Sequence, residues 1–180
     1  SSVRPTVNKK ASQYSIVNGM ERKMREYLLY MLLYDGIDSL YIGVDSAAVI
    51  EMPKVDLPRR EMPIVVYGTS ITQGACASRP GMAYTNILER EMNREFYNFG
   101  FSGNGQLDME VAPLLASVDA GLYIFDCLPN NTAPQLKERL EPFYRYLREK
   151  RPDVPILFIE SPLFPIMRFN EGTAKAINEK

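Results

Sequence analysis

Short apolar runs alternate with longer amphipathic stretches over the last two thirds of the chain, and this alternation restricts the fold more than any other feature. The runs are short enough to be buried strands and lie at residues 64–67, 95–101, 121–125 and 155–159. Between them, apolar side chains recur every three or four positions, as on one face of a helix, at residues 84–92, 107–118 and 136–147. Strands that alternate with helices predict right-handed βαβ units and a parallel sheet covered by helices.

Two prolines fall inside these predicted helices. Pro113 lies in the second helical stretch and Pro142 in the third. A proline inside a helix costs about 3 kcal/mol unless it begins a turn or kinks the helix. The sequence therefore leaves open where these two helices begin and end.

The chain before residue 57 has a different pattern. Its first 25 residues are polar and show no period, whereas residues 27–34 and 39–44 are rich in aromatic and β-branched side chains. Asp35-Gly36 lies between these two runs, and this dipeptide predicts a β-hairpin. The residues that follow carry several prolines and mixed charges, which is typical of a linker. We therefore predict two units, residues 1–56 and residues 57–180.

The composition excludes several classes of function. The 180 residues contain no histidine, which excludes a histidine-ligated metal site and a histidine base supplied by this chain. The net charge is −1, from 22 acidic and 21 basic groups, so we expect no nucleic-acid partner. We expect no metal and no cofactor. The longest nearly apolar run, residues 27–34, is too short for a membrane span, which takes about 20 residues.

The residues that follow each predicted strand are where chemistry is expected, because parallel sheets bind ligands beyond the carboxyl ends of their strands. Ser70 follows the first strand, a glycine-rich turn at residues 100–105 follows the second, and Asn130 follows the third. Such a turn points backbone N–H groups at an anion or oxyanion. A hydroxyl, backbone donors and an amide together fit stabilisation of the oxyanion formed in acyl transfer.

Each of these features also has a simpler interpretation. A turn like the one around Ser70 is usually a helix cap. The glycine-rich turn would otherwise be a phosphate site or a plain turn, and Asn130 would otherwise cap the next helix. Asp126 and Glu160 follow other strands, where each is either a site carboxylate or an ordinary loop acceptor. Cys76 has no histidine to activate it as a nucleophile, and Cys127 fits packing. The residues alone do not choose between these interpretations.

Three blocks in order resemble the SGNH (GDSL-like) hydrolase family. Residues 67–74 read Tyr-Gly-Thr-Ser-Ile-Thr-Gln-Gly, where most members have Gly-Asp-Ser-Leu. Residues 99–103 match the glycine block, and residues 128–131 match the block that usually reads Gly-x-Asn-Asp. The amino-acid sequence of these blocks is similar to that of one branch of the family, which carries a β-sandwich ahead of the hydrolase domain. Residues 1–56 would then be the C-terminal part of that sandwich.

The resemblance implies a three-layer α/β/α, flavodoxin-like fold and hydrolysis of an ester. It makes Ser70 the nucleophile, with the N–H groups of Ser70 and Gly103 and the side chain of Asn130 holding the oxyanion. Neighbouring polar side chains are then expected to bind substrate; these are Thr69, Asn104 and Glu160.

The family's fourth block, Asp-x-x-His, has no counterpart in the 180 residues. We expect that the chain is cut before that block and is nearly inert by itself. A ligand-binding module without catalysis, and an enzyme with Asp126 or Glu160 as a substitute base, are the alternatives. The expected substrate is a small-molecule or carbohydrate ester, such as an acetylated sugar, and the branch suggests a secreted or periplasmic protein.

Overall fold

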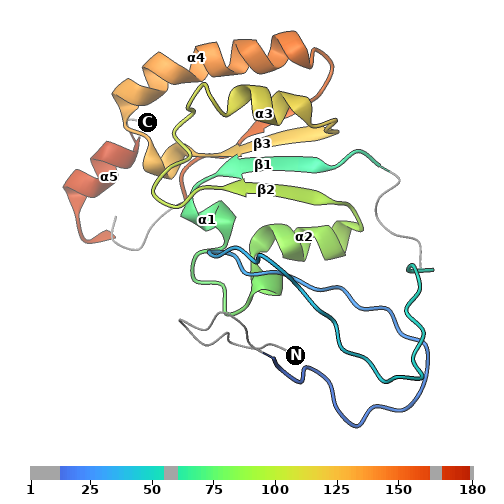
Figure 1. Cartoon of the computed structure of the whole chain (residues 1–180). Helices are drawn as coiled ribbons and strands as arrows, with labels where there is room; N and C mark the ends of the chain where they lie inside the picture. The colour runs from blue at the N-terminus through green and yellow to red at the C-terminus, as the bar shows by residue number, and fades with distance from the viewer. Residues whose placement is uncertain (1–12, 55–60, 163–167, 179–180) are drawn as a thin grey trace.

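Four parallel strands form the single sheet of the described structure, a computed structural model that covers residues 13–54, 61–162 and 168–178. The strand order is β2-β1-β3-β4 (Figure 1). Their bounds are β1 (Ile64–Gly68), β2 (Phe96–Gly100), β3 (Leu122–Asp126) and β4 (Ile156–Phe158). All pairings are parallel, with Gly68 of β1 level with Gly100 of β2 and Asp126 of β3. The predicted parallel α/β fold is confirmed.

Helices cover both faces of this sheet. Figure 1 shows α3 and α4 on one face and α1 and α2 on the other, which gives three layers. The helices are α1 (Ser70–Gln73), α2 (Tyr84–Met92), α3 (Ala112–Ser117), α4 (Ala133–Lys150) and α5 (Glu171–Asn178). Two short 3-10 turns complete the described elements, η2 (Pro80–Met82) and η3 (Leu128–Asn130).

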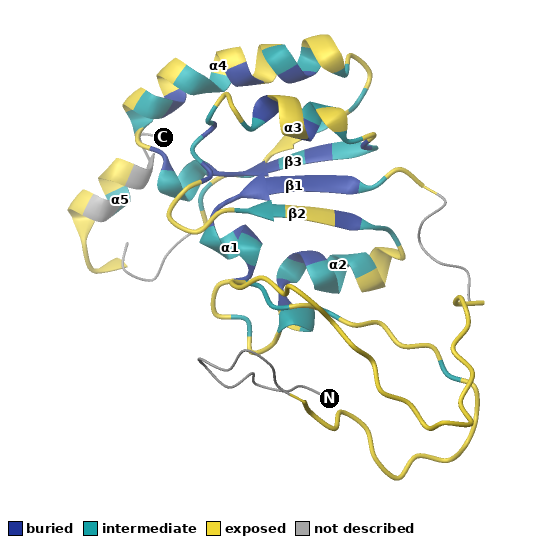
Figure 2. Ribbon diagram, viewed as in Figure 1, coloured by how far each residue is buried: buried dark blue, intermediate teal, exposed yellow. Residues whose placement is uncertain are grey.

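The core lies on both faces of the central strand, and every residue of β1 is buried (Figure 2). Val65 and Tyr67 point into the larger cluster, which includes residues of α3 and α4. Ile64 and Val66 belong to the smaller cluster, against which residues of α2 pack. A continuous apolar run is what a strand covered on both faces requires, and this explains why 64–67 could be recognised in the sequence.

The second predicted helix is shorter than expected. The apolar spacing predicted a helix over residues 107–118, but α3 begins at Ala112. Leu107 has a left-handed backbone (φ 59°), which cannot continue a right-handed helix, and its side chain is fully buried. Leu107 therefore anchors a loop to the core, and its spacing matches the helix by coincidence. Pro113 lies in the first turn of α3, where proline is tolerated, whereas α4 runs through Pro142.

The predicted N-terminal hairpin is not found. Residues 13–54 contain no strand and instead run as extended chain past α1 and α2 (Figure 1). Tyr30 packs against Gly81, and the guanidinium of Arg90 lies 5.2 Å from the centre of the Tyr30 ring. A hairpin without further strands beside it is marginal in water, and none of the strands among the described residues lies beside this segment. The β-sandwich assignment and the boundary near residue 56 stay predictions, and residues 55–60 lie outside the described ranges.

Candidate active site

The loops that follow β1, β2 and β3 contact one another, because these strands are neighbours and their carboxyl ends share one edge of the sheet. The N–H of Phe101, just after β2, donates to the carbonyl of Gly68 at the end of β1, with an N···O distance of 2.9 Å. Gly105 (φ 73°) lies so close that a Cβ there would collide with the carbonyl oxygen of Gly68. The second loop is therefore pressed against the turn that leads to Ser70.

Ser70 is the first residue of α1 and is half-buried. The helix cap is its neighbour Thr69, whose hydroxyl accepts from the N–H of Ile71 at 3.3 Å. Helix capping therefore does not account for Ser70. Its carbonyl accepts from the N–H groups of Gly74 and Ala75, so its backbone is held in place.

Asn130 lies in η3 and ties the third loop to the second. Its side-chain amide donates to the carbonyl of Asn104 at 2.6 Å, and the amide of Gln106 donates to the Asn130 carbonyl at 3.1 Å. The cap of α4 is Thr132, which forms a capping box with Gln135, so capping does not account for Asn130 either. An amide has two N–H donors, so the contact with Asn104 engages only one of them.

The other predicted site residues differ in exposure. Gly103 (φ 71°) and Asn104 are exposed at the tip of the second loop, where the N–H of Asn104 donates to the carbonyl of Phe101. Thr69 is fully buried, and its hydroxyl is engaged in the cap of α1. Glu160 is exposed two residues beyond β4. The structure thus brings the loops of Ser70, Gly103 and Asn130 together, while the roles of all six residues stay predictions.

Asp126 is a buried carboxylate with two hydroxyl partners. One of its oxygens accepts from the hydroxyl of Thr72 at 2.9 Å and from that of Tyr84 at 3.0 Å. Burial, together with the negative charge of Asp126, raises the pKa of Tyr84 above its usual value, so this hydroxyl stays protonated and donating. A Cβ at Gly68 would collide with the Thr72 hydroxyl. These contacts join β3 to α1 and α2 and favour Asp126 as a structural acceptor rather than a substitute base.

Two amide side chains that the sequence analysis did not single out also hold these loops. Gln73 contacts both the backbone of Ser102 and that of Leu33. Asn131 is buried and donates to the carbonyl of Cys127 at 2.7 Å and to that of Gly105 at 3.3 Å. Both lie inside the blocks that resemble the hydrolase family. Their position in a block does not show whether a side chain faces solvent or forms hydrogen bonds to the backbone of a loop.

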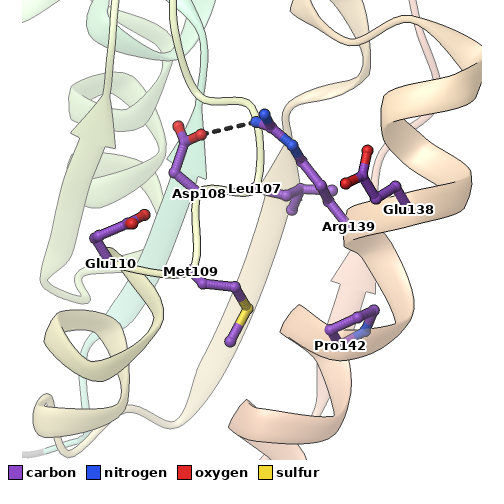
Figure 3. Close-up of a pocket in the computed structure, with 7 residues that line it drawn as sticks. All are labelled: Leu107, Asp108, Met109, Glu110, Glu138, Arg139 and Pro142. Atoms are coloured by element: carbon purple, nitrogen blue, oxygen red, sulfur yellow. Dashed lines mark hydrogen bonds and ion pairs between the residues drawn. The ribbon is translucent and has the colours of Figure 1, made fainter.

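A hollow of about 360 Å³ lies behind the second loop, between residues 107–110 and α4 (Figure 3). Arg139 crosses it, pairing with Asp108 at 2.7 Å and donating to the carbonyl of Gln106 at 3.0 Å. Ser70, Gly103 and Asn130 do not line the hollow. Arg139 therefore ties α4 to the second loop through Asp108 and the backbone of Gln106.

Two negative findings hold for the described ranges. No helix within them has both the length and the apolar character to cross a membrane. In the same ranges, no three side chains of the metal-ligating types are grouped to hold an ion.

Two family models together match most of the chain. Residues 61–180 match the GDSL-like Lipase/Acylhydrolase family, and residues 1–50 match the N-terminus of the SGNH hydrolase-type esterases. A crystal structure of a "putative GDSL-like lipase" from Bacteroides ovatus is 42% identical, with a TM-score of 0.78. The match covers 83% of this chain and 44% of that one, so the chain spans less than half the length of its structural relative.

A more distant structure shares the fold alone. It is the salicylyl-acyltransferase SsfX3 from a tetracycline biosynthetic pathway, at 20% identity and a TM-score of 0.51, with 74% of this chain and 42% of that one covered. No curated protein matches the chain. The family match covers two thirds of the residues, and the chain belongs to the GDSL-like lipase/acylhydrolase family.

Proposed function

We propose that the protein is a serine-dependent ester hydrolase in which Ser70 attacks the acyl carbonyl. The observation that carries the proposal is the contact among three loops, which gathers the Ser70 turn, the Gly103 loop and the Asn130 turn at one edge of the sheet. As the carbonyl becomes tetrahedral, its oxygen gains negative charge. The N–H groups of Ser70 and Gly103 and the amide of Asn130 are the donors we assign to it.

The hydroxyl of Ser70 also needs a base, because serine is a weak nucleophile until a neighbour takes its proton. We assign this step to a histidine outside these 180 residues, since they contain none and match less than half of their structural relative. Removing the base of a serine hydrolase costs on the order of 10⁶ in turnover. The 180 residues alone should therefore turn over substrate very slowly.

The family supports a small-molecule ester as substrate. Within that class we propose an O-acetylated carbohydrate, on the resemblance to the branch with an accessory domain. The acyl group passes to the Ser70 oxygen as its bond to the sugar oxygen breaks, and the sugar alcohol leaves with the proton that the base took from Ser70. Water then attacks the acyl-enzyme, which releases the acid and restores the Ser70 hydroxyl. The rate of acetate release from an acetylated sugar, compared with the rate of p-nitrophenol release from p-nitrophenyl butyrate, tests this choice. Acetate should be released faster.

The test of the reaction class uses the full-length product of the gene. A fluorophosphonate probe should label Ser70, and p-nitrophenyl acetate should be hydrolysed. Ser70→Ala should abolish both, since a serine nucleophile contributes on the order of 10⁶ in kcat. Labelling that persists in Ser70→Ala would place the nucleophile elsewhere.

The lack of histidine favours one second candidate, a hydrolase-like module that binds a ligand without turning it over. The same measurement separates the two candidates. A full-length product with neither turnover nor labelling, but with measurable binding of an ester, would support the module.

A further inference from the structure

The side chain of Gln73 joins two backbone segments that are distant in sequence. Its oxygen accepts from the N–H of Ser102 at 2.8 Å, and its nitrogen donates to the carbonyl of Leu33 at 3.0 Å. Because an N–H must face the amide oxygen and a carbonyl must face the amide nitrogen, the two partners fix the orientation of this amide. Gln73 is the last residue of α1, three positions after Ser70.

The backbone of Gln73 rests directly on the end of β2. A Cβ at Gly100 would collide with the Gln73 nitrogen, so this contact needs glycine at position 100. The next two peptides are then held in succession. The N–H of Phe101 bonds to Gly68, and that of Ser102 bonds to Gln73. The chain that leads to Gly103 is thus fixed to the turn that carries Ser70.

The N-terminal segment holds the other side of the same short helix. The hydroxyl of Tyr34 donates to the carbonyl of Ser70 at 3.1 Å, at the start of α1. The side chain of Leu33 lies over Gly74, directly after α1. Leu33 and Tyr34 therefore contact both ends of α1, and the Leu33 carbonyl also holds the amide of Gln73.

We propose that Gln73 is a positioning residue, which fixes the Phe101–Ser102 peptide, directly before the peptide of the Gly103 N–H, relative to Ser70 while the backbone of Leu33 holds its amide in place. The inference rests on the proposed function, in which the Gly103 N–H binds the oxyanion. Gly103 is exposed, and within the described residues open space surrounds the place of its missing Cβ. No described side chain packs against Gly103 on that side, so the backbone around it places its N–H: the Asn104 N–H bonds to the Phe101 carbonyl, and Gln73 holds the Phe101–Ser102 peptide just before it.

The proposal predicts a change in kcat rather than in KM. Gln73→Met keeps the length of the side chain but loses both hydrogen bonds. In the full-length product, kcat for p-nitrophenyl acetate should fall about 10- to 100-fold, because a misplacement of about 1 Å in an active site can cost that much. KM should change little, since the substrate contacts remain.

Tyr123→Phe is the matched control. It also removes a side-chain hydrogen bond to the backbone, in which the hydroxyl proton is shared between the carbonyls of Leu115 and Val118, but at the opposite end of the sheet. It should lower Tm and leave kcat unchanged. Equal losses of kcat in both variants would show a general effect of stability and would overturn the proposal.

Amide hydrogen exchange gives a readout that does not depend on turnover. In Gln73→Met the N–H of Ser102 should exchange faster, while that of Tyr123, which bonds to Pro155 within the sheet, should stay protected. If Gln73→Met does not fold, Gln73→Asn replaces it, because an amide one methylene shorter cannot reach both partners.

The outcomes separate this inference from the proposed function. If Ser70→Ala abolishes turnover while Gln73→Met leaves kcat intact, the inference is wrong and the function stands. If Ser70→Ala retains full turnover, the function is wrong, whatever Gln73→Met does. An unchanged exchange rate at Ser102 would overturn the inference by itself.

Discussion

Residues 61–162 and residues 13–54 are both rich in aromatic and β-branched side chains, yet only the first region forms strands. Every residue of β1 is buried between two neighbouring strands and two layers of helices. In the N-terminal segment Tyr27, Tyr41 and Ile42 are mostly exposed, Tyr41 to 90% (Figure 2). The difference teaches that strand-forming composition becomes a strand only where a partner strand and a covering layer are present.

The largest effect expected from this comparison is on stability. Phe143 of α4 is buried, and its ring lies 5.7 Å from that of Tyr67 and 5.6 Å from that of Phe125. Phe143→Ala should lower the free energy of unfolding by about 3–5 kcal/mol, from lost transfer energy and the cavity left behind. Urea unfolding followed by circular dichroism measures this change.

The matched variant in the N-terminal segment is Tyr41→Ala. Because Tyr41 is almost fully exposed, the free energy of unfolding should change by no more than about 0.5 kcal/mol. A loss of several kcal/mol in Tyr41→Ala would break the comparison, since it would mean that the Tyr41 side chain is itself packed.

The next effect concerns the edge of the sheet. In the full-length product, Asn130→Ala should lower kcat by about 10²–10³, the usual cost of losing one oxyanion donor. Asn18→Ala is the control, because Asn18 is exposed and its side chain accepts an exposed hydrogen bond from Ser15. A silent Asn130→Ala would remove Asn130 from the oxyanion site.

High pH should lower the free energy of unfolding through groups buried in the packed region. Burial raises the pKa of the Cys127 thiol and of the Tyr67 hydroxyl to about 12, from ordinary values of 9.0 and 10.0. The folded state keeps these protons longer than the unfolded chain, so the stability they add is complete below about pH 9 and is lost as pH rises toward 12. Urea unfolding between about pH 8 and 11 measures this loss.

Cys127→Ala separates the thiol from the buried tyrosines. The fall in stability should begin about one pH unit later in this variant, at the ordinary tyrosine value of 10.0 that Tyr67 and Tyr84 share. Ellman's reagent gives a further check, because exposed Cys76 should react in the folded protein and buried Cys127 only after unfolding. Stability that rises above pH 9 would contradict the burial of both groups.

The smallest effect tests whether the two regions are joined. Tyr34→Phe removes the hydrogen bond to the Ser70 carbonyl, which is exposed and worth about 0.5–1.5 kcal/mol. We expect kcat to fall a few-fold, with Tyr41→Phe as the unaffected control. Equal kcat in both variants would mean that the N-terminal segment does not contribute to the geometry of the site.

The sequence predicted those features that repeat or that occupy a recognisable block. Runs such as residues 64–67 consist of apolar residues alone, as a strand covered on both faces requires, so the strands and their parallel direction could be predicted. Leu107 shows where apolar spacing misleads. It fits the spacing of the predicted helix, yet its backbone is left-handed and it lies in a loop. The contacts of Gln73 could not be predicted, because they join residues 33, 73 and 102, which only the folded chain brings together.

The most direct test of the proposed site is a crystal structure of the full-length product after reaction with a fluorophosphonate. The phosphonyl oxygen should lie about 2.7–3.1 Å from the backbone nitrogens of Ser70 and Gly103 and from the side-chain nitrogen of Asn130. An adduct on Ser70 whose oxygen points to solvent, away from Gly103 and Asn130, would contradict the account.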